Sequence, residues 1–119
     1  KFHLVDSTQK KVRVVDAVSN ELGLKNVTTE CNRIEDMDDK FDFILIRAVA
    51  QMSKILKWTL NNINSHSNNS FLNGIIALKG GDLNKELIKI ENKKIVAIND
   101  YFDDHYFVDK KLVYIPFES

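Results

Sequence analysis

The run Phe41-Asp-Phe-Ile-Leu-Ile-Arg-Ala-Val constrains the fold more than any other stretch of the chain. From Phe41 to Ile46 it is almost entirely apolar, which is typical of a parallel strand that helices cover on both faces. In open sheets of this kind the ligand crevice lies beyond the carboxyl ends of the strands. Arg47 stands at that point, and a buried guanidinium needs a ligand or a carboxylate as partner. The run therefore predicts an α/β fold with a binding crevice at Arg47, and a structural ion pair with a nearby aspartate is the alternative.

Composition limits the class of protein. With 119 residues, 44% of them hydrophobic, the chain is long enough for one compact domain and too short for two, so residues 1–119 are interpreted as a single domain. Lys plus Arg equals Asp plus Glu at 17 each, so RNA binding would have to come from a local basic patch.

The cysteine and hydropathy patterns predict a cytoplasmic protein. Cys31 is the single cysteine, and no second cysteine or nearby histidine gives it metal-site spacing, so we expect neither a disulfide nor a metal. No apolar run approaches the roughly 20 residues that a membrane span requires, so no membrane partner is expected. A strand already begins at Phe2 with nothing leading into it, and the chain is therefore interpreted as a fragment.

Strands and helices alternate along the sequence. A helix is expected between the capping segment Asp6-Ser7-Thr8 and Gly23, with Val14, Val15, Val18 and Leu22 on its apolar face. Further helices are expected at 52–60 and near 83–90, and the asparagine-rich segment 61–70 is predicted to be an exposed loop. Strands are expected at 1–5, 27–31, 41–46, 74–78, 95–98 and 111–115, the last two as an antiparallel pair. This order predicts a three-layer α/β sandwich.

Four charged residues near predicted strand ends could carry chemistry. Asp6 could accept the hydroxyls of a ribose or could merely cap the helix that follows, and its position favours neither. Glu35 could read the polar edge of a purine, although a solvated acidic loop is the simpler interpretation. Lys79 repeats the placement of Arg47 at the end of the next strand, and two such cations could form a phosphate patch.

Five segments in order resemble one family, the bacterial small-subunit ribosomal RNA methyltransferase G, also called glucose-inhibited division protein B. The segments are Val5-Asp-Ser-Thr-Gln-Lys-Lys11, Glu21-Leu-Gly-Leu-Lys-Asn-Val27, Asn32-Arg-Ile-Glu-Asp36, Ile46-Arg-Ala-Val-Ala50 and Ala77-Leu-Lys-Gly80. The resemblance implies a class I, Rossmann-like methyltransferase fold. It also implies methyl transfer from S-adenosylmethionine to nitrogen seven of a guanine in 16S ribosomal RNA, with that RNA or the small ribosomal subunit as partner.

The resemblance also implies roles for individual residues. By position, Asp6, Ser7 and Thr8 are implied to contact the ribose region of the cofactor, and we call them the ribose group. Ile34 and Glu35 are implied to contact its adenine, and we call them the adenine group. Arg47 matches the arginine at the active-site strand end, and the resemblance implies that it contacts both the cofactor and the RNA. Arg33 and Lys79 match basic positions near the cofactor and RNA cleft and are expected to contact the RNA. No general base is expected, because nitrogen seven of guanine already carries a lone pair, so no catalytic residue is assigned.

The sequence departs from the family in one respect. In the family a helical N-terminal region, a strand and a glycine-rich cofactor loop precede the position of Phe2, and this sequence lacks them. In the usual strand order the missing strand lies between the strands at 1–5 and 41–46. Without it, two strand edges would stay unpaired, and we expect weak or no cofactor binding by this chain alone. A class I methyltransferase with another substrate is one alternative function. A non-catalytic nucleotide-binding or assembly module is the other.

Overall fold

The computed structural model describes residues 1–47, 51–66, 69–80, 83–87, 90, 92–105 and 108–117. Positions 48–50, which close the apolar run and one of the family-like segments, lie outside these ranges. The contacts divide the chain into two compact units, Lys1–Asp38 and Asp39–Ser119, and each is described by itself. The single domain expected from the chain length stays a prediction.

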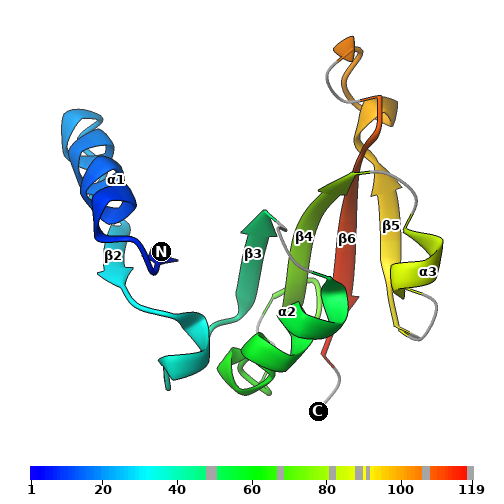
Figure 1. The fold of residues 1–119 in the computed structure, drawn as a ribbon, viewed down its shortest axis with the longest axis horizontal. Coiled ribbons are helices and arrows are strands. Elements are labelled where there is room, and N and C mark those ends of the chain that lie inside the picture. The colour runs from blue at the N-terminus through cyan, green and yellow to red at the C-terminus, as the bar shows by residue number, and fades with distance from the viewer. Residues whose placement is uncertain are drawn as a thin grey trace. The chain divides into compact units, whose positions relative to one another are not determined.

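The first unit is a strand, a helix and a strand. It consists of β1 (Phe2–Asp6), α1 (Gln9–Glu21) and β2 (Val27–Cys31), followed by the 3-10 turn η1 (Ile34–Asp36) (Figure 1). β1 and β2 pair in parallel, with Phe2 opposite Val27 and Asp6 opposite Cys31. The parallel register places the carboxyl ends of both strands together, which is where the sequence predicts a ligand.

Helix α1 begins and ends where the sequence predicts, but it buries a different face. Thr8 is its N-cap, and Gly23 follows its end with a φ of +66°, the left-handed conformation that glycine adopts without strain. Val12 is buried, whereas three residues of the predicted apolar face are mostly exposed: Val14 at 59%, Val18 at 52% and Leu22 at 66%. A two-stranded sheet offers a helix only a narrow surface, so a single stripe that includes Val12 is covered.

The second unit is a mixed four-stranded sheet with helices. Its elements are β3 (Phe43–Arg47), α2 (Met52–Thr59), η2 (Leu60–Asn62), β4 (Gly74–Gly80), α3 (Asn84–Leu87), β5 (Lys94–Ala97), η3 (Ile98–Asp100) and β6 (Lys110–Pro116). The strand order is β3-β4-β6-β5, in which β3 and β4 are parallel and β6 is antiparallel to both of its neighbours. The predicted antiparallel pair at the C-terminal end is therefore confirmed.

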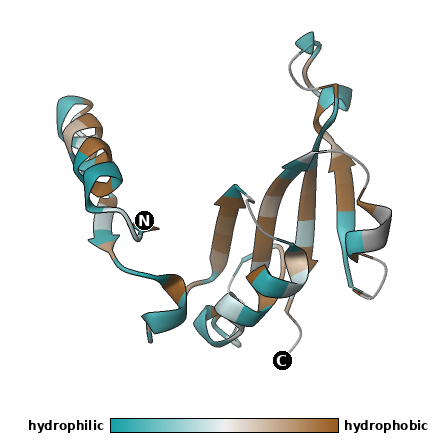
Figure 2. Cartoon of the chain, in the orientation of Figure 1, coloured by the Kyte–Doolittle hydropathy of each residue, from teal (hydrophilic) through white to brown (hydrophobic). Residues whose placement is uncertain are grey.

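The core of this unit lies between one face of the sheet and the two helices. Met52 and Ile55 of α2 and Leu87 of α3 pack against Ile75, Ala77, Val113 and Ile115 of β4 and β6. Figure 2 shows hydrophobic colour along β3 and β4. Side chains alternate between the faces of a strand. Leu45 and Leu78 accordingly lie on the face opposite the core, where their exposed fractions are 70% and 44%.

Part of the asparagine-rich segment is buried, in contrast to the predicted exposed loop. Asn62 and Ile63 are buried, and Ile63 forms a parallel β-bridge with Phe41. The amide of the buried Asn73 donates to the backbone carbonyl oxygens of Asn64 at 3.0 Å and His66 at 3.1 Å. Asparagine amides can satisfy backbone carbonyls inside a folded loop, and a pattern of turn-forming residues does not by itself predict this.

Among the described strands, β1 pairs with β2 alone and β3 pairs with β4 alone. Each of β1 and β3 therefore has one open edge, along which alternate backbone N–H and C=O groups have no ladder partner. These are the two strands between which the resemblance places one further strand.

Candidate functional site

Asp6 lies at the carboxyl end of β1, and the two oxygens of its carboxylate differ in their contacts. The Thr8 N–H donates to Asp6 Oδ1 at 2.8 Å, which orders the turn before α1. The other oxygen, Oδ2, makes no hydrogen bond to a described residue. The hydroxyl-bearing side chains of Ser7 and Thr8 beside it are exposed. One carboxylate oxygen therefore supports the helix, and the second remains available to a ligand.

The turn after β2 is tied to the end of β1. The Asn32 N–H donates to the Asp6 carbonyl oxygen at 3.0 Å, and the Arg33 N–H donates to Asn32 Oδ1 at 2.8 Å. Ile34 in η1 is half-buried, and Glu35 is exposed. The first N–H groups of such a turn have no acceptor within it. The structure thus brings the predicted ribose group and the predicted adenine group to one edge of the first unit.

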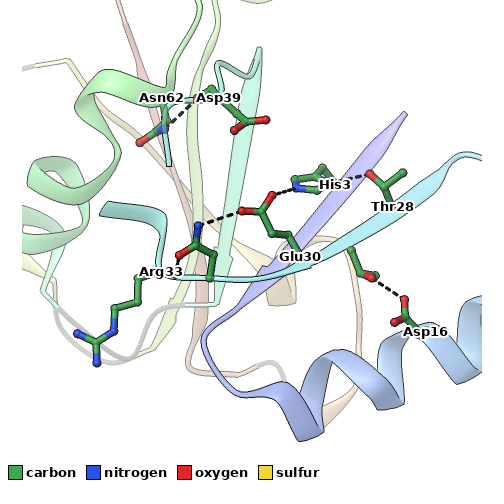
Figure 3. Close-up of polar contacts among 9 residues, drawn as sticks. His3, Asp16, Thr28, Glu30, Arg33, Asp39 and Asn62 are labelled. Atoms are coloured by element: carbon green, nitrogen blue, oxygen red, sulfur yellow. Dashed lines mark hydrogen bonds and ion pairs between the residues drawn. The ribbon is translucent and has the colours of Figure 1, made fainter. Parts of the chain in front are cut away.

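A polar network on β1 and β2 adjoins this edge (Figure 3). His3 Nδ1 and Thr28 Oγ1 are hydrogen-bonded at 2.7 Å, and His3 Nε2 lies 3.2 Å from Glu30 Oε1. The Asn32 amide donates to Glu30 Oε2 at 3.0 Å. The hydrogen bond from Asn32, followed by that from His3, holds the pKa of Glu30 below its ordinary value.

No motif in the sequence predicted this network. Thr28, Glu30 and Asn32 recur at a spacing of two, so the alternation of a strand could have placed them on one face. His3 joins that face only through the pairing of β1 with β2, because His3 lies opposite Thr28. The network braces the two strands that carry Asp6 and the η1 turn.

Arg47 ends β3 and is exposed. It pairs with Leu78 in the parallel ladder, which confirms its placement at a strand end beside β4. Its guanidinium makes no ion pair with any residue in the ranges that the structure describes. No described aspartate or glutamate therefore forms the structural ion pair that was the alternative for Arg47. The Arg47 guanidinium can bind an anion.

Lys79 lies at the neighbouring strand end but not on the same face. Since Arg47 is opposite Leu78, the side chain of Lys79, one residue further, points to the other face of the sheet. Its ammonium forms an ion pair with Glu86 Oε1 of α3, and its side chain is only 8% exposed. The second predicted cation is therefore engaged within the protein, and the first is open to solvent.

The third predicted cation, Arg33, extends from the turn after β2. Figure 3 shows its guanidinium pointing away from the Glu30 network, and no described residue forms an ion pair with it. Within the described ranges no cluster of histidine, cysteine, aspartate or glutamate has the arrangement of a metal site. The described helices are all too short or too polar to cross a membrane.

Comparison with known proteins gives one consistent result. The sequence matches the family described as "rRNA small subunit methyltransferase G" over residues 1–108. A "Ribosomal RNA small subunit methyltransferase G" of Christiangramia forsetii is 46% identical over 115 residues, which cover 97% of this chain and 54% of the relative. The protein of the same name from Bacteroides fragilis is 43% identical over 116 residues, 97% of this chain and 56% of the relative. The chain thus spans about half the length of these curated relatives.

Proposed function

Because this chain belongs to the rRNA small subunit methyltransferase G family, we propose that its protein methylates nitrogen seven of a guanine in 16S ribosomal RNA. The methyl donor in this proposal is S-adenosylmethionine, and the substrate is the RNA or the small ribosomal subunit in the cytoplasm. The fold is the α/β, class I, Rossmann-like fold of that family, present here in part. The observation that carries the proposal is the hydrogen bond from the Asn32 N–H to the Asp6 carbonyl oxygen, which ties the end of β1 to the segment that leads into η1.

The residues around this hydrogen bond fit a nucleoside. The unpartnered Oδ2 of Asp6 can accept hydrogen bonds from ribose hydroxyls, and the exposed Ser7 and Thr8 can add polar contacts. Ile34 offers a half-buried apolar surface for a purine face. The Glu35 carboxylate can accept from an exocyclic amine. These residues would hold the adenosine part of the cofactor. The cofactor supplies an activated methyl group when bound.

Two exposed arginines support an RNA substrate. The Arg33 and Arg47 guanidinium groups are available to phosphates, and such groups supply affinity through counterion release. Lys79 would have to leave Glu86 before it could contact a phosphate. The support for RNA from basic residues therefore comes from two of the three predicted cations.

The proposed chemistry depends on the alignment of the guanine with the methyl donor and needs no acid or base catalysis. The guanine lone pair forms the new N–CH₃ bond while the S–CH₃ bond breaks, and the positive charge passes from sulfur to the purine ring. No proton is transferred in this step, so the residues of the chain have to orient the two reactants and exclude water. The target base must also be accessible, which for a paired base requires that it leave its stack.

The test is a binding and transfer experiment on three proteins. These are this chain, a form extended upstream to the length of the relatives, and the extended form with Arg47→Ala. We expect the extended form to bind S-adenosylmethionine in calorimetry and to leave N7-methylguanine in 16S RNA, detected by nucleoside mass spectrometry. Loss of transfer with retained cofactor binding in Arg47→Ala would assign that arginine to the RNA. Methylation of another substrate, or no cofactor binding at all, would overturn the proposal.

A further inference from the structure

The carboxylate of Glu86 connects three elements of the second unit. Its Oε1 accepts from the Lys79 ammonium of β4 and also from the Met52 N–H, at 2.8 Å, at the start of α2. Glu86 itself belongs to α3. A carboxylate near the first turn of a helix satisfies an otherwise unpaired N–H group and interacts favourably with the helix dipole. One oxygen atom therefore joins β4, α2 and α3, which are shown in Figure 1.

Packing holds this junction in place. Met52 is fully buried, and Leu83 and Leu87 on either side of Glu86 belong to the same hydrophobic cluster. The side chains of Lys79 and Glu86 are only 8% and 17% exposed. Breaking such a pair from one side leaves an uncompensated charge in a poorly solvated place, which is strongly unfavourable.

The junction is close to the predicted active-site strand end. Arg47 is paired with Leu78, the residue immediately before Lys79, and Met52 begins the helix that follows β3. The Lys79 and Glu86 charges cancel, so this place attracts phosphate weakly. A phosphate that approached Lys79 would also meet the Glu86 carboxylate.

We propose that Glu86 is a positioning residue, and that Lys79 serves with it to fix the start of α2 and the β4 end beside Arg47 rather than to contact RNA phosphate. This inference rests on the proposed function and assigns a new role to one of its residues. A small displacement of an aligned site is enough to slow transfer substantially. The contacts of each side chain thus divide the three predicted cations into two that are open to a phosphate, Arg33 and Arg47, and one, Lys79, that holds a strand end.

The experiment uses the full-length protein that contains this chain, with Lys79→Met, Glu86→Gln and the double variant. Thermal unfolding of all four proteins forms a double-mutant cycle. We expect each single variant to lower the Tm by several degrees and the double variant to lower it by clearly less than the sum, because it leaves no unpaired charge. Additive shifts in Tm would show that Lys79 and Glu86 do not act together, and this result would overturn the proposed coupling between them.

Kinetics distinguish positioning from phosphate contact. At a temperature where all variants are folded, we expect Lys79→Met and Glu86→Gln to lower kcat on the order of tenfold with the KM for RNA unchanged. The salt dependence of RNA binding should keep its slope in Lys79→Met, whereas Arg33→Gln should reduce it by about one unit. The exposed Lys57 of α2, changed to methionine, is the matched control for loss of a lysine, with kcat unchanged.

The opposite pattern would overturn the proposal. If Lys79→Met weakened RNA binding and reduced the salt slope while Glu86→Gln bound RNA as well as the wild type or better, Lys79 would be a phosphate contact. Unchanged kcat in both single variants would make the pair merely structural. If the wild type transferred no methyl group, the proposed function would fail and the positioning role with it. The Tm cycle would still decide whether the junction exists.

Discussion

At the scale of single residues, the two oxygens of the Asp6 carboxylate differ in what they contact. Oδ1 accepts from the Thr8 N–H and orders the start of α1, while Oδ2 has no partner among the described residues. The two interpretations that its sequence position left equal therefore do not exclude each other. They also predict different results for two substitutions at this one position.

In the form extended upstream to the length of the relatives, Asp6→Asn should separate support of the α1 start from binding of the cofactor ribose. Asparagine can still accept from the Thr8 N–H, so we expect a nearly unchanged Tm. Loss of the charged acceptor should weaken S-adenosylmethionine binding by about tenfold to a hundredfold in calorimetry. Asp6→Ala is the matched control and should lower both affinity and Tm. Equal cofactor affinity in Asp6→Asn and wild type would remove Asp6 from the ribose site.

Glu30 gives a prediction about pH. Hydrogen bonds from Asn32 and His3 lower its pKa in the folded state, so its contribution to stability is present above the unfolded-state pKa and is lost as the pH falls through the folded-state pKa. We expect Glu30→Gln to be less stable than wild type at neutral pH and equally stable in strong acid, measured by urea unfolding across pH. A constant difference at every pH would contradict this linkage.

At the scale of elements, the sequence predicts strands better than it predicts faces and partners. β2 occupies Val27–Cys31 as expected, because Gly23 ends the helix before it and the segment consists largely of good strand formers. The predicted apolar face of α1 was wrong, because the width of the surface that covers a helix depends on tertiary structure. Among the site residues, the group around Asp6 and η1 follows from strand order, because parallel strands bring their carboxyl ends together.

The pairing of Lys79 with Glu86 could not be predicted in the same way. Which face a strand residue occupies depends on register, and an offset of one residue reverses it. Lys79 is offset by one from Leu78, the partner of Arg47, so the two predicted cations point to opposite faces. Glu86 lies on a short helix whose docking depends on buried Leu83 and Leu87 rather than on local propensity.

Gly74 gives a prediction about the ladder between β4 and β6. A Cβ at Gly74 would lie 2.3 Å from the backbone oxygen of Ile115, so an alanine would force the two strands apart. We expect Gly74→Ala to cost about 3 kcal/mol in urea unfolding. Gly23→Ala is the control: its Cβ would meet no atom within 4 Å, and only the positive φ should cost about 1 kcal/mol. Equal losses at both glycines would contradict the close approach of β4 and β6 at Gly74.

At the scale of the whole molecule, the strands that the structure describes form two sheets. β1-β2 and β3-β4-β6-β5 each end in an open edge, and the chain spans about half the length of its curated relatives. Ladder groups that lack partners are unfavourable when buried and promote association when exposed. Asp6, proposed to contact the cofactor, and Arg47 thus end strands that each pair on one side alone in the described residues.

Hydrogen exchange should show whether a longer form completes these edges. In this chain alone, we expect rapid exchange of the outward-facing amides of β1 and β3 and little or no binding of S-adenosylmethionine by calorimetry. In a form extended upstream to the length of the relatives, both edges should become protected, because added backbone supplies their hydrogen bonds. Amides within the β4–β6 ladder are the internal control and should be protected in both forms. Tight cofactor binding by this chain, with β1 and β3 still exchanging rapidly, would show that the open edges do not limit the site.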